Sequence, residues 1–141
     1  MSGSETRAAR PASFSRVALN QVMRRAQENL YGVTHGGEIL KLADTAAGAA
    51  SFRHCGGRTV TRSVESAEFA APVELGSLVH ATATVVSAGR TSLRVEVVVE
   101  KEPLYALSPG EREAVGTVVF VMVHLDPDGR PAPVPGVASQ E

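Results

Sequence analysis

The chain has 141 residues, which suits one domain with a single core. Apolar residues make up 43% of it and charged residues 21%, a balance that excludes global disorder. The net charge is −1 and the isoelectric point is near 6.4, so we expect neither nucleic acid nor a membrane surface as a partner.

The sequence also indicates a compartment. The N-terminal residues lack the apolar stretch of a secretory signal, and no apolar run is long enough to span a bilayer. The one cysteine, Cys55, has no second cysteine with which to form an internal disulfide. We therefore expect a cytoplasmic protein.

Three segments differ in composition. Residues 1–13 are small and polar and are expected to form a flexible arm. Residues 127–141 contain too much proline and glycine to belong to the core and are expected to form a tail. A single domain is expected between them, over residues 14–126.

The domain is predicted to begin with one strand and one long helix. A strand is favoured over residues 14–23, although a helix also fits that pattern. Residues 37–54 predict a helix with almost no polar face, which we expect to be buried on most sides. Its many alanines and glycines allow another backbone to approach closely, and Gly56 and Gly57 supply its end.

After this helix the periodicity changes to two. Four successive strands are predicted, over residues 58–69, 77–89, 91–102 and 113–126. The third alternates most clearly, with Leu93, Val95, Val97 and Val99 on one face. The fourth is apolar on both faces, as a central or interface strand would be. A helix followed by strands at hairpin spacing predicts an α+β domain with a mostly antiparallel sheet.

One acid interrupts the apolar helix. Asp44 lies between Ala43 and Ala46, on a face of small and apolar side chains. Such a face removes water from a carboxylate and makes it a better base. Asp44 is therefore a candidate catalytic residue.

Two glycines precede this helix, at positions 36 and 37. Glycine lets a ligand approach the backbone closely, and the first N–H groups of a helix have no intrahelical partners and favour negative charge. The N–H of Gly37, together with that of Glu38, is a candidate oxyanion hole. Asn29 lies 15 residues before Asp44 in the preceding loop, where its amide can orient water or a substrate.

Several short motifs occur in a fixed order. They are Asn29-x-x-Gly32, His35-Gly36-Gly37-x-Ile39-Leu40-Lys41-x-x-Asp44, Arg53-His54-Cys55, Val60-Thr61, Phe69-x-x-Pro72-Val73-x-x-Gly76 and Gly89-Arg90-Thr91-Ser92. From residue 16 to residue 136, this order resembles the hotdog-fold acyl-CoA thioesterases, above all the brain-type acyl-CoA hydrolase branch and its single-domain bacterial relatives. The stretch from His35 to Asp44 also resembles the phenylacetic-acid-pathway thioesterases.

The resemblance implies a hotdog fold, in which a five- to six-stranded, mostly antiparallel sheet wraps one long helix. It implies hydrolysis of acyl-CoA to the free acid and CoA, with CoA entering only as part of the substrate and with no metal or other cofactor. Asp44 would serve as base or nucleophile. Asn29 of one chain would work with Asp44 of its partner, so a homodimer with shared sites is expected. A hexamer or a tetramer assembled from such dimers is compatible with this.

The CoA end of the substrate also has candidates. The turn at residues 89–92 offers a cation and two hydroxyl groups, which suit phosphate, and the resemblance implies CoA contacts in that region. The CoA-binding candidates are His35, Gly36, Arg53, His54, Arg58, Gly89, Arg90, Thr91 and Ser92.

Other readings of these residues are weaker. The four histidines lack metal-ligand spacing, and His80 and His124 are expected on strand surfaces. Cys55 is expected at a helix C-terminus, which disfavours the thiolate. Two rival functions remain. A non-catalytic acyl-CoA sensor would not need both Asn29 and Asp44, and a hotdog hydratase would need a histidine a few residues after the acid, where none follows.

Overall fold

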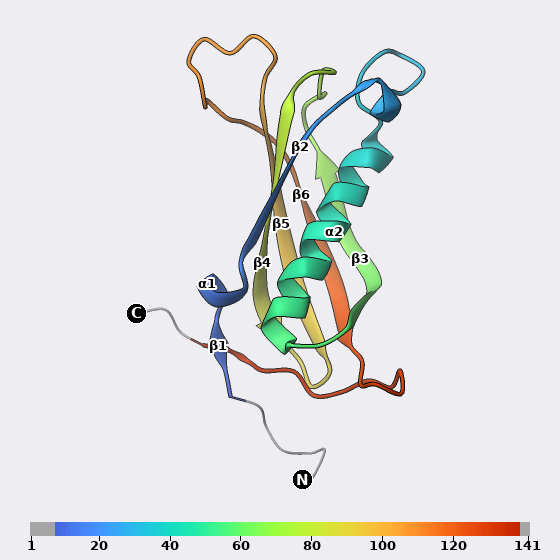
Figure 1. Cartoon of the computed structure of the whole chain (residues 1–141), viewed down its shortest axis with the longest axis vertical. Coiled ribbons are helices and arrows are strands. Elements are labelled where there is room, and N and C mark those ends of the chain that lie inside the picture. Colours follow the sequence, from blue (N-terminus) through green and yellow to red (C-terminus); the bar gives the residue numbers. More distant parts are fainter. Residues whose placement is uncertain (1–7, 139–141) are drawn as a thin grey trace.

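The computed structural model describes residues 8–138 and contains one long helix against a sheet (Figure 1). Its elements are β1 (Arg10–Pro11), α1 (Ala12–Ser15), β2 (Val17–Val22), the 3-10 helix η1 (Arg25–Gln27), α2 (Gly36–Cys55), β3 (Thr59–Phe69), β4 (Leu78–Ala88), β5 (Ser92–Glu102), β6 (Glu113–His124) and β7 (Val137–Ala138). Residues 1–7 of the expected arm and 139–141 of the expected tail lie outside the described residues.

Strands β2 to β6 form one antiparallel sheet in the order β2-β4-β5-β6-β3. Helix α2 follows β2 and precedes β3, the two opposite edges, so it crosses one face of the sheet (Figure 1). The predicted helix and the last four predicted strands match α2 and β3 to β6 within two residues at each end. The predicted α+β class and hotdog arrangement are confirmed.

Small side chains let α2 lie close to the sheet. Ala43, Ala46, Ala47 and Ala50 are fully buried beneath it. The sheet meets them with larger residues, and the predicted alternation of β5 is confirmed because the four apolar residues of one face, at 93, 95, 97 and 99, are at most 1% exposed. Burying one such side chain stabilises the fold by about 1.5–3 kcal/mol.

One stripe of α2 is open, but 14 of its 20 residues are buried or half-buried, so the expectation that this helix is buried on most sides is confirmed. Phe52 is 59% exposed, and Lys41, Thr45 and Arg53 are exposed too. This stripe is the part of the helix surface that the sheet does not cover. Among residues 8–138, no helix is long and apolar enough to cross a membrane.

The edge strand β3 is the second open surface. All of its residues except Thr59 are exposed, including Val60, Val64 and Phe69. It pairs with β6 on one side only. An edge strand presents a row of unpaired N–H and C=O groups that another strand can take up.

The start of the domain differs from its prediction. The first sheet strand begins at Val17, whereas Phe14 and Ser15 belong to α1. This turn of helix directs Ser15 into the core, where its Oγ lies 2.9 Å from His54 Nδ1. Residues 10–13, which we expected in the arm, form β1 and the first half of α1.

The C-terminal segment also contributes to the core. Val134 is only 6% exposed, so the expectation that this proline-rich segment lies wholly outside the core was wrong. The carbonyl oxygens of Pro135 and Gly136 lie 3.2 and 3.1 Å from His54 Nε2, and β7 pairs with β1. One buried imidazole therefore joins both ends of the domain to the last turn of α2.

The two strand histidines are buried, contrary to expectation. His80 is 5% exposed and lies between Asn20 and Glu102, and His124 is 8% exposed with Nδ1 3.0 Å from the Pro133 oxygen. Polar partners on neighbouring strands and on the C-terminal segment satisfy these rings, which strand alternation alone does not reveal.

Gly116 in β6 tests how closely β3 is packed. A Cβ at this position would lie 1.8 Å from the carbonyl oxygen of Glu68. We expect Gly116→Ala to lower the free energy of unfolding by about 2–3 kcal/mol, because β3 must move. Gly48→Ala is the control, since its added Cβ meets nothing within 4 Å and alanine favours helix by about 1 kcal/mol. Urea denaturation measures both, and equal stabilities of the two variants would contradict this account.

Candidate active site

Asp44 lies in α2 on the side that faces β3. Its Oδ1 accepts a hydrogen bond of 2.5 Å from Thr61 Oγ1, and its side chain is half-buried. No donor within residues 8–138 reaches the other carboxylate oxygen, Oδ2. The carboxylate is therefore held at one oxygen and available at the other.

Sequence reasoning gave Thr61 no role. Thr59 and Thr61 share one face of β3 because strand side chains alternate, and Thr59 Oγ1 lies 2.7 Å from Ser51 Oγ of the same helix. The period-two pattern predicts that the two threonines face the same way. Which face meets α2 depends on the path of the chain after Cys55, and the sequence does not specify it.

The N-terminus of α2 has unpaired donors. The Glu38 N–H donates to the His35 oxygen at 2.9 Å, so this expected member of the oxyanion hole is already occupied. Within the part of the chain that the structure describes, no acceptor takes the N–H of Gly36 or Gly37. The two glycines therefore leave a pair of donors for a developing negative charge.

His35 shapes this end of the helix. It is the residue before α2, its side chain makes no capping hydrogen bond, and its own N–H donates to the Gln27 oxygen at 2.6 Å. A Cβ at position 37 would lie 3.0 Å from His35 Cδ2 and Nε2. Glycine at position 37 thus leaves room for the imidazole beside the helix N-terminus.

Asn29 organises the loop between η1 and α2. Its Oδ1 accepts hydrogen bonds from Tyr31 N at 2.8 Å and Val33 N at 3.2 Å. The carbonyl of the side chain is used by the loop, so the amide NH₂ is the group that remains for a ligand. With Glu28, Leu30, Tyr31 and His35, Asn29 lines a hollow of about 520 Å³.

A smaller hollow of about 310 Å³ has Gly36 in its lining. Its lining is mostly apolar and comes from the first turn of α2 and from the segment that follows β3. The lining residues are Thr34, Gly36, Ile39, Phe69, Ala70, Ala71, Pro72 and Val73.

One protomer does not bring Asn29 and Asp44 together by a hydrogen bond. Asn29 belongs to the loop before α2, and Asp44 lies about two turns inside it. The partners of each side chain within residues 8–138 are different: loop amides for Asn29 and Thr61 for Asp44.

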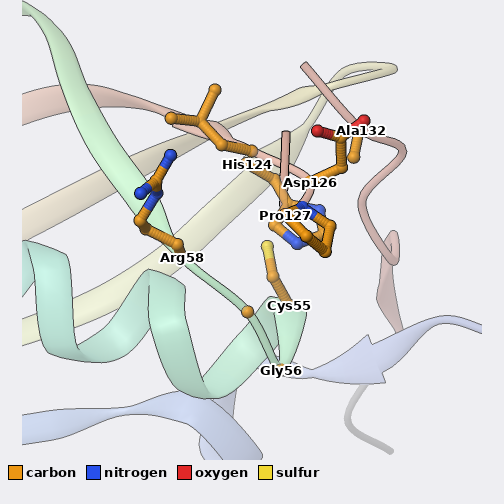
Figure 2. A pocket seen from close by; sticks show the side chains of 9 residues that line it. Cys55, Gly56, Arg58, His124, Asp126, Pro127 and Ala132 are labelled. Atoms are coloured by element: carbon orange, nitrogen blue, oxygen red, sulfur yellow. The ribbon is translucent and has the colours of Figure 1, made fainter. Parts of the chain in front are cut away.

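Arg58 lies at the opposite end of α2. It lines a hollow of about 430 Å³ with Cys55, Gly57, His124 and Asp126 among others. Figure 2 shows Arg58 on one side of this hollow and Asp126 and Ala132 on the other, with the Cys55 side chain between them. The guanidinium of Arg58 is exposed.

The turn from Gly89 to Ser92 lies at the same end. The Thr91 oxygen accepts the N–H of His124 and the Arg90 oxygen that of Val134, each at 3.0 Å. Because Leu125, the next residue after His124, donates to the Arg58 oxygen at 2.8 Å, the end of β6 connects this turn to Arg58. The structure thus brings Arg58 and Arg90 to one region.

Two other CoA-binding candidates have internal partners. The Arg53 side chain donates to the Arg16 oxygen at 3.1 Å. His54 is fully buried, and both its ring nitrogens lie against partners in the terminal segments. Their contacts secure the ends of the chain, and the imidazole of His54 has no free nitrogen for a ligand.

Three exposed charged groups have shifted pKa values. The hydrogen bond from Arg94 lowers the pKa of Glu65 and raises that of Arg94 itself. The N–H of Arg130, followed by those of Asp128 and Gly129, lowers the pKa of Asp126 despite some desolvation. No three His, Cys, Asp or Glu side chains in residues 8–138 are grouped so as to hold a metal ion.

Comparison with known proteins assigns the family. The model of the thioesterase superfamily matches residues 31–107, more than half of the chain. The chain belongs to the thioesterase superfamily. One curated relative is an uncharacterized acyl-CoA thioester hydrolase of Zymomonas mobilis. It is 32% identical over 84% of this chain and 77% of its own length.

A mammalian relative is much longer. The cytosolic acyl coenzyme A thioester hydrolase of Rattus norvegicus is 30% identical over 87% of this chain but only 32% of its own length. The chain therefore spans about a third of the mammalian relatives it matches.

Two solved structures resemble this thioesterase-superfamily chain. An acyl-CoA hydrolase from Staphylococcus aureus, in complex with butyryl coenzyme A and coenzyme A, is 25% identical with a TM-score of 0.84 and covers 96% of this chain and 78% of its own. A hexameric broad-specificity acyl-coenzyme A thioesterase, solved as an aspartate-to-alanine mutant, is 28% identical with a TM-score of 0.77 and covers 83% and 84%.

The lowered pKa of Asp126 gives a pH-dependent prediction. A carboxylate with a lowered folded-state pKa stabilises the protein above its ordinary pKa of 3.8 and loses that contribution as pH falls through the folded-state pKa. We expect Asp126→Asn to lower Tm slightly at pH 7, with the difference from wild type shrinking as pH falls below about 4. Scanning calorimetry from pH 7 to pH 2.5 measures this. A difference that is constant with pH would contradict the ionic role.

Proposed function

We propose that this protein hydrolyses acyl-CoA thioesters to the free acid and CoA. The observation that carries the proposal is the Asp44 carboxylate, which is fixed by Thr61 at one oxygen and unpaired at the other. Membership of the thioesterase superfamily and acyl-CoA thioester hydrolases among the relatives support it. The cytoplasm is the proposed location, since the mammalian relatives are named cytosolic.

In the proposed reaction, the thioester oxygen accepts hydrogen bonds from the N–H groups of Gly36 and Gly37. Asp44 Oδ2 takes a proton from a water molecule, whose oxygen attacks the carbonyl carbon. The tetrahedral intermediate collapses, the C–S bond breaks, and the CoA sulfur leaves as a thiolate that takes up the proton. Direct attack by Oδ2, followed by hydrolysis of the resulting anhydride, balances equally well.

Asn29 is assigned a donor role in this reaction. Its Oδ1 already accepts two loop N–H groups, so its NH₂ group would donate to the thioester oxygen or to the carboxylate. The sequence also allowed Asn29 to orient the attacking water. Acceptance of a hydrogen bond from that water is disfavoured, because Oδ1 already accepts two hydrogen bonds.

The complete site would be shared between two chains. Antiparallel pairing of β3 with β3 of a second copy would cover its exposed edge and continue the sheet. Because β3 follows α2 directly, this pairing would bring the N-terminal end of one helix toward the C-terminal end of the other. Asn29 of one protomer would then approach Asp44 of its partner. A hexameric relative supports an assembly of this kind.

The same pairing gives each end of the substrate a place. The apolar hollow beside Gly36 suits the acyl group. The partner's helix C-terminal end, with Arg58, Arg90, Thr91 and Ser92, would meet the CoA nucleotide, whose phosphates pair with guanidinium groups. Gly89 would permit the tight turn that presents them.

Thiol release tests the proposed reaction. With a panel of short, long and aromatic acyl-CoA esters, we expect wild type to release CoA and Asp44→Asn to lose at least about 10³-fold in kcat, since it lacks the base or nucleophile. Thr61→Val removes only the hydrogen bond to Oδ1 and should cost about 10-fold. Release by a folded Asp44→Asn at the wild-type rate would contradict the role of this carboxylate.

Truncated substrates test the CoA contacts. Acyl-pantetheine keeps the thioester but lacks the nucleotide. We expect Arg58→Glu or Arg90→Glu to lower kcat/KM for acyl-CoA by about 10-fold or more, the value of a charged hydrogen bond, and to leave kcat/KM for acyl-pantetheine unchanged. Arg112→Glu is the matched control, because Arg112 pairs with Glu100 at the surface and belongs to none of these contacts. Equal losses with both substrates would remove the two arginines from the nucleotide contact.

A further inference from the structure

Lys101 in β5 is a buried charge that the proposed reaction does not use. The residue is 4% exposed. Its Nζ donates to the Pro72 oxygen at 2.5 Å and to Glu74 Oε1 at 2.8 Å, and it lies 3.8 Å from Glu113 Oε2. Burying an ammonium group costs several kcal/mol unless it is well paired, so these partners fix where the segment of residues 72–74 lies.

The same segment holds the loop that carries Asn29. The Val73 oxygen accepts the N–H of Thr34 at 2.9 Å, and Glu74 forms an antiparallel bridge with Val33. Val33 in turn pairs with Asn29 in both directions: the Asn29 N–H donates to its oxygen at 2.8 Å, and its N–H donates to Asn29 Oδ1 at 3.2 Å.

These contacts form a continuous path from a charge in the sheet to the amide of the site. The tip of the loop is exposed, with Leu30 and Tyr31 96% and 87% exposed, while at its base Glu28 forms a bridge with Thr34. Residues 72–74 lie between Lys101 and the loop that carries Asn29. They are bonded to Lys101 on one side and to Val33 and Thr34 on the other.

We propose that Lys101 is a positioning residue, which acts through residues 72–74 to hold the Asn29 amide in its catalytic place. This inference rests on the proposed thioesterase function. The ammonium does not touch the substrate. It fixes the position of the loop relative to the N-terminus of α2. A misplacement of about 1 Å in such a group can cost about 10²-fold in rate.

Lys101→Met tests the proposal, because methionine keeps an unbranched chain in the core and removes the charge. We expect kcat for acyl-CoA to fall about 10- to 100-fold, KM to change less than kcat, and Lys101→Arg to restore part of the loss. Arg94→Met is the control. Arg94 lies on the same strand as Lys101, and its substitution removes an exposed ion pair with Glu65 of β3, so kcat should be unchanged.

A double-mutant cycle separates positioning from general damage. With Asn29→Ala present, Lys101→Met should lower kcat little further, because the group it positions is gone. Losses that multiply in the double variant would overturn the proposal. If Lys101→Met does not fold, Glu74→Gln replaces it in the same cycle with the same expectations.

Hydrogen exchange provides a readout that does not need turnover. The N–H groups of Val33 and Thr34 should exchange faster in Lys101→Met, while those in the middle of β5 keep their wild-type protection. Unchanged exchange at Val33 and Thr34 would overturn the proposal, even if wild type hydrolyses no thioester. Absence of thioester hydrolysis with faster exchange would leave the mechanical link intact and reject the catalytic role of the loop.

Discussion

The close approach of α2 to the sheet determines both the packing of the core and the position of Asp44. It requires small side chains on the buried face, and four alanines there have no exposed surface. At the β3 side of the same helix, polar groups replace apolar packing: Asp44 meets Thr61, and Ser51 meets Thr59. The helix can hold a carboxylate in a fixed place because its backbone is itself fixed by the alanine contacts. A larger residue in place of one of these four alanines would displace Asp44 as well as the core.

The groups assigned to the proposed site lie at opposite ends of one helix. The donors at Gly36 and Gly37 and the Asn29 amide lie at one end of a helix of 20 residues, and Arg58 and Arg90 lie at the other. That helix is about 30 Å long. The exposed edge of β3 is the surface through which a second copy would bring opposite ends together. The same strand thus connects the stability of the assembly to the proposed chemistry.

The periodic elements, and the places of Asp44 inside α2 and of Gly36 and Gly37 at its start, could be predicted from sequence, because their signals are local. The alternation of Leu93 to Val99 gave the buried face of β5, and the apolar run around Asp44 gave α2. The ends of the domain could not be predicted, because their positions depend on His54, whose partners are 39 to 82 residues away. Thr61 and the occupied N–H of Glu38 were missed for a related reason: each depends on a contact or a cap geometry that composition does not encode.

Subunit complementation tests whether two chains build one site. Asn29→Ala and Asp44→Asn chains are each expected to be folded and inactive. Unfolding and refolding them together would form mixed dimers, in which one of the two sites keeps both residues. With random pairing, we expect up to about half of the dimers to be mixed and the mixture to regain about a quarter of the wild-type activity per chain. Mixed dimers without thioesterase activity, alongside an active wild type treated in the same way, would contradict it.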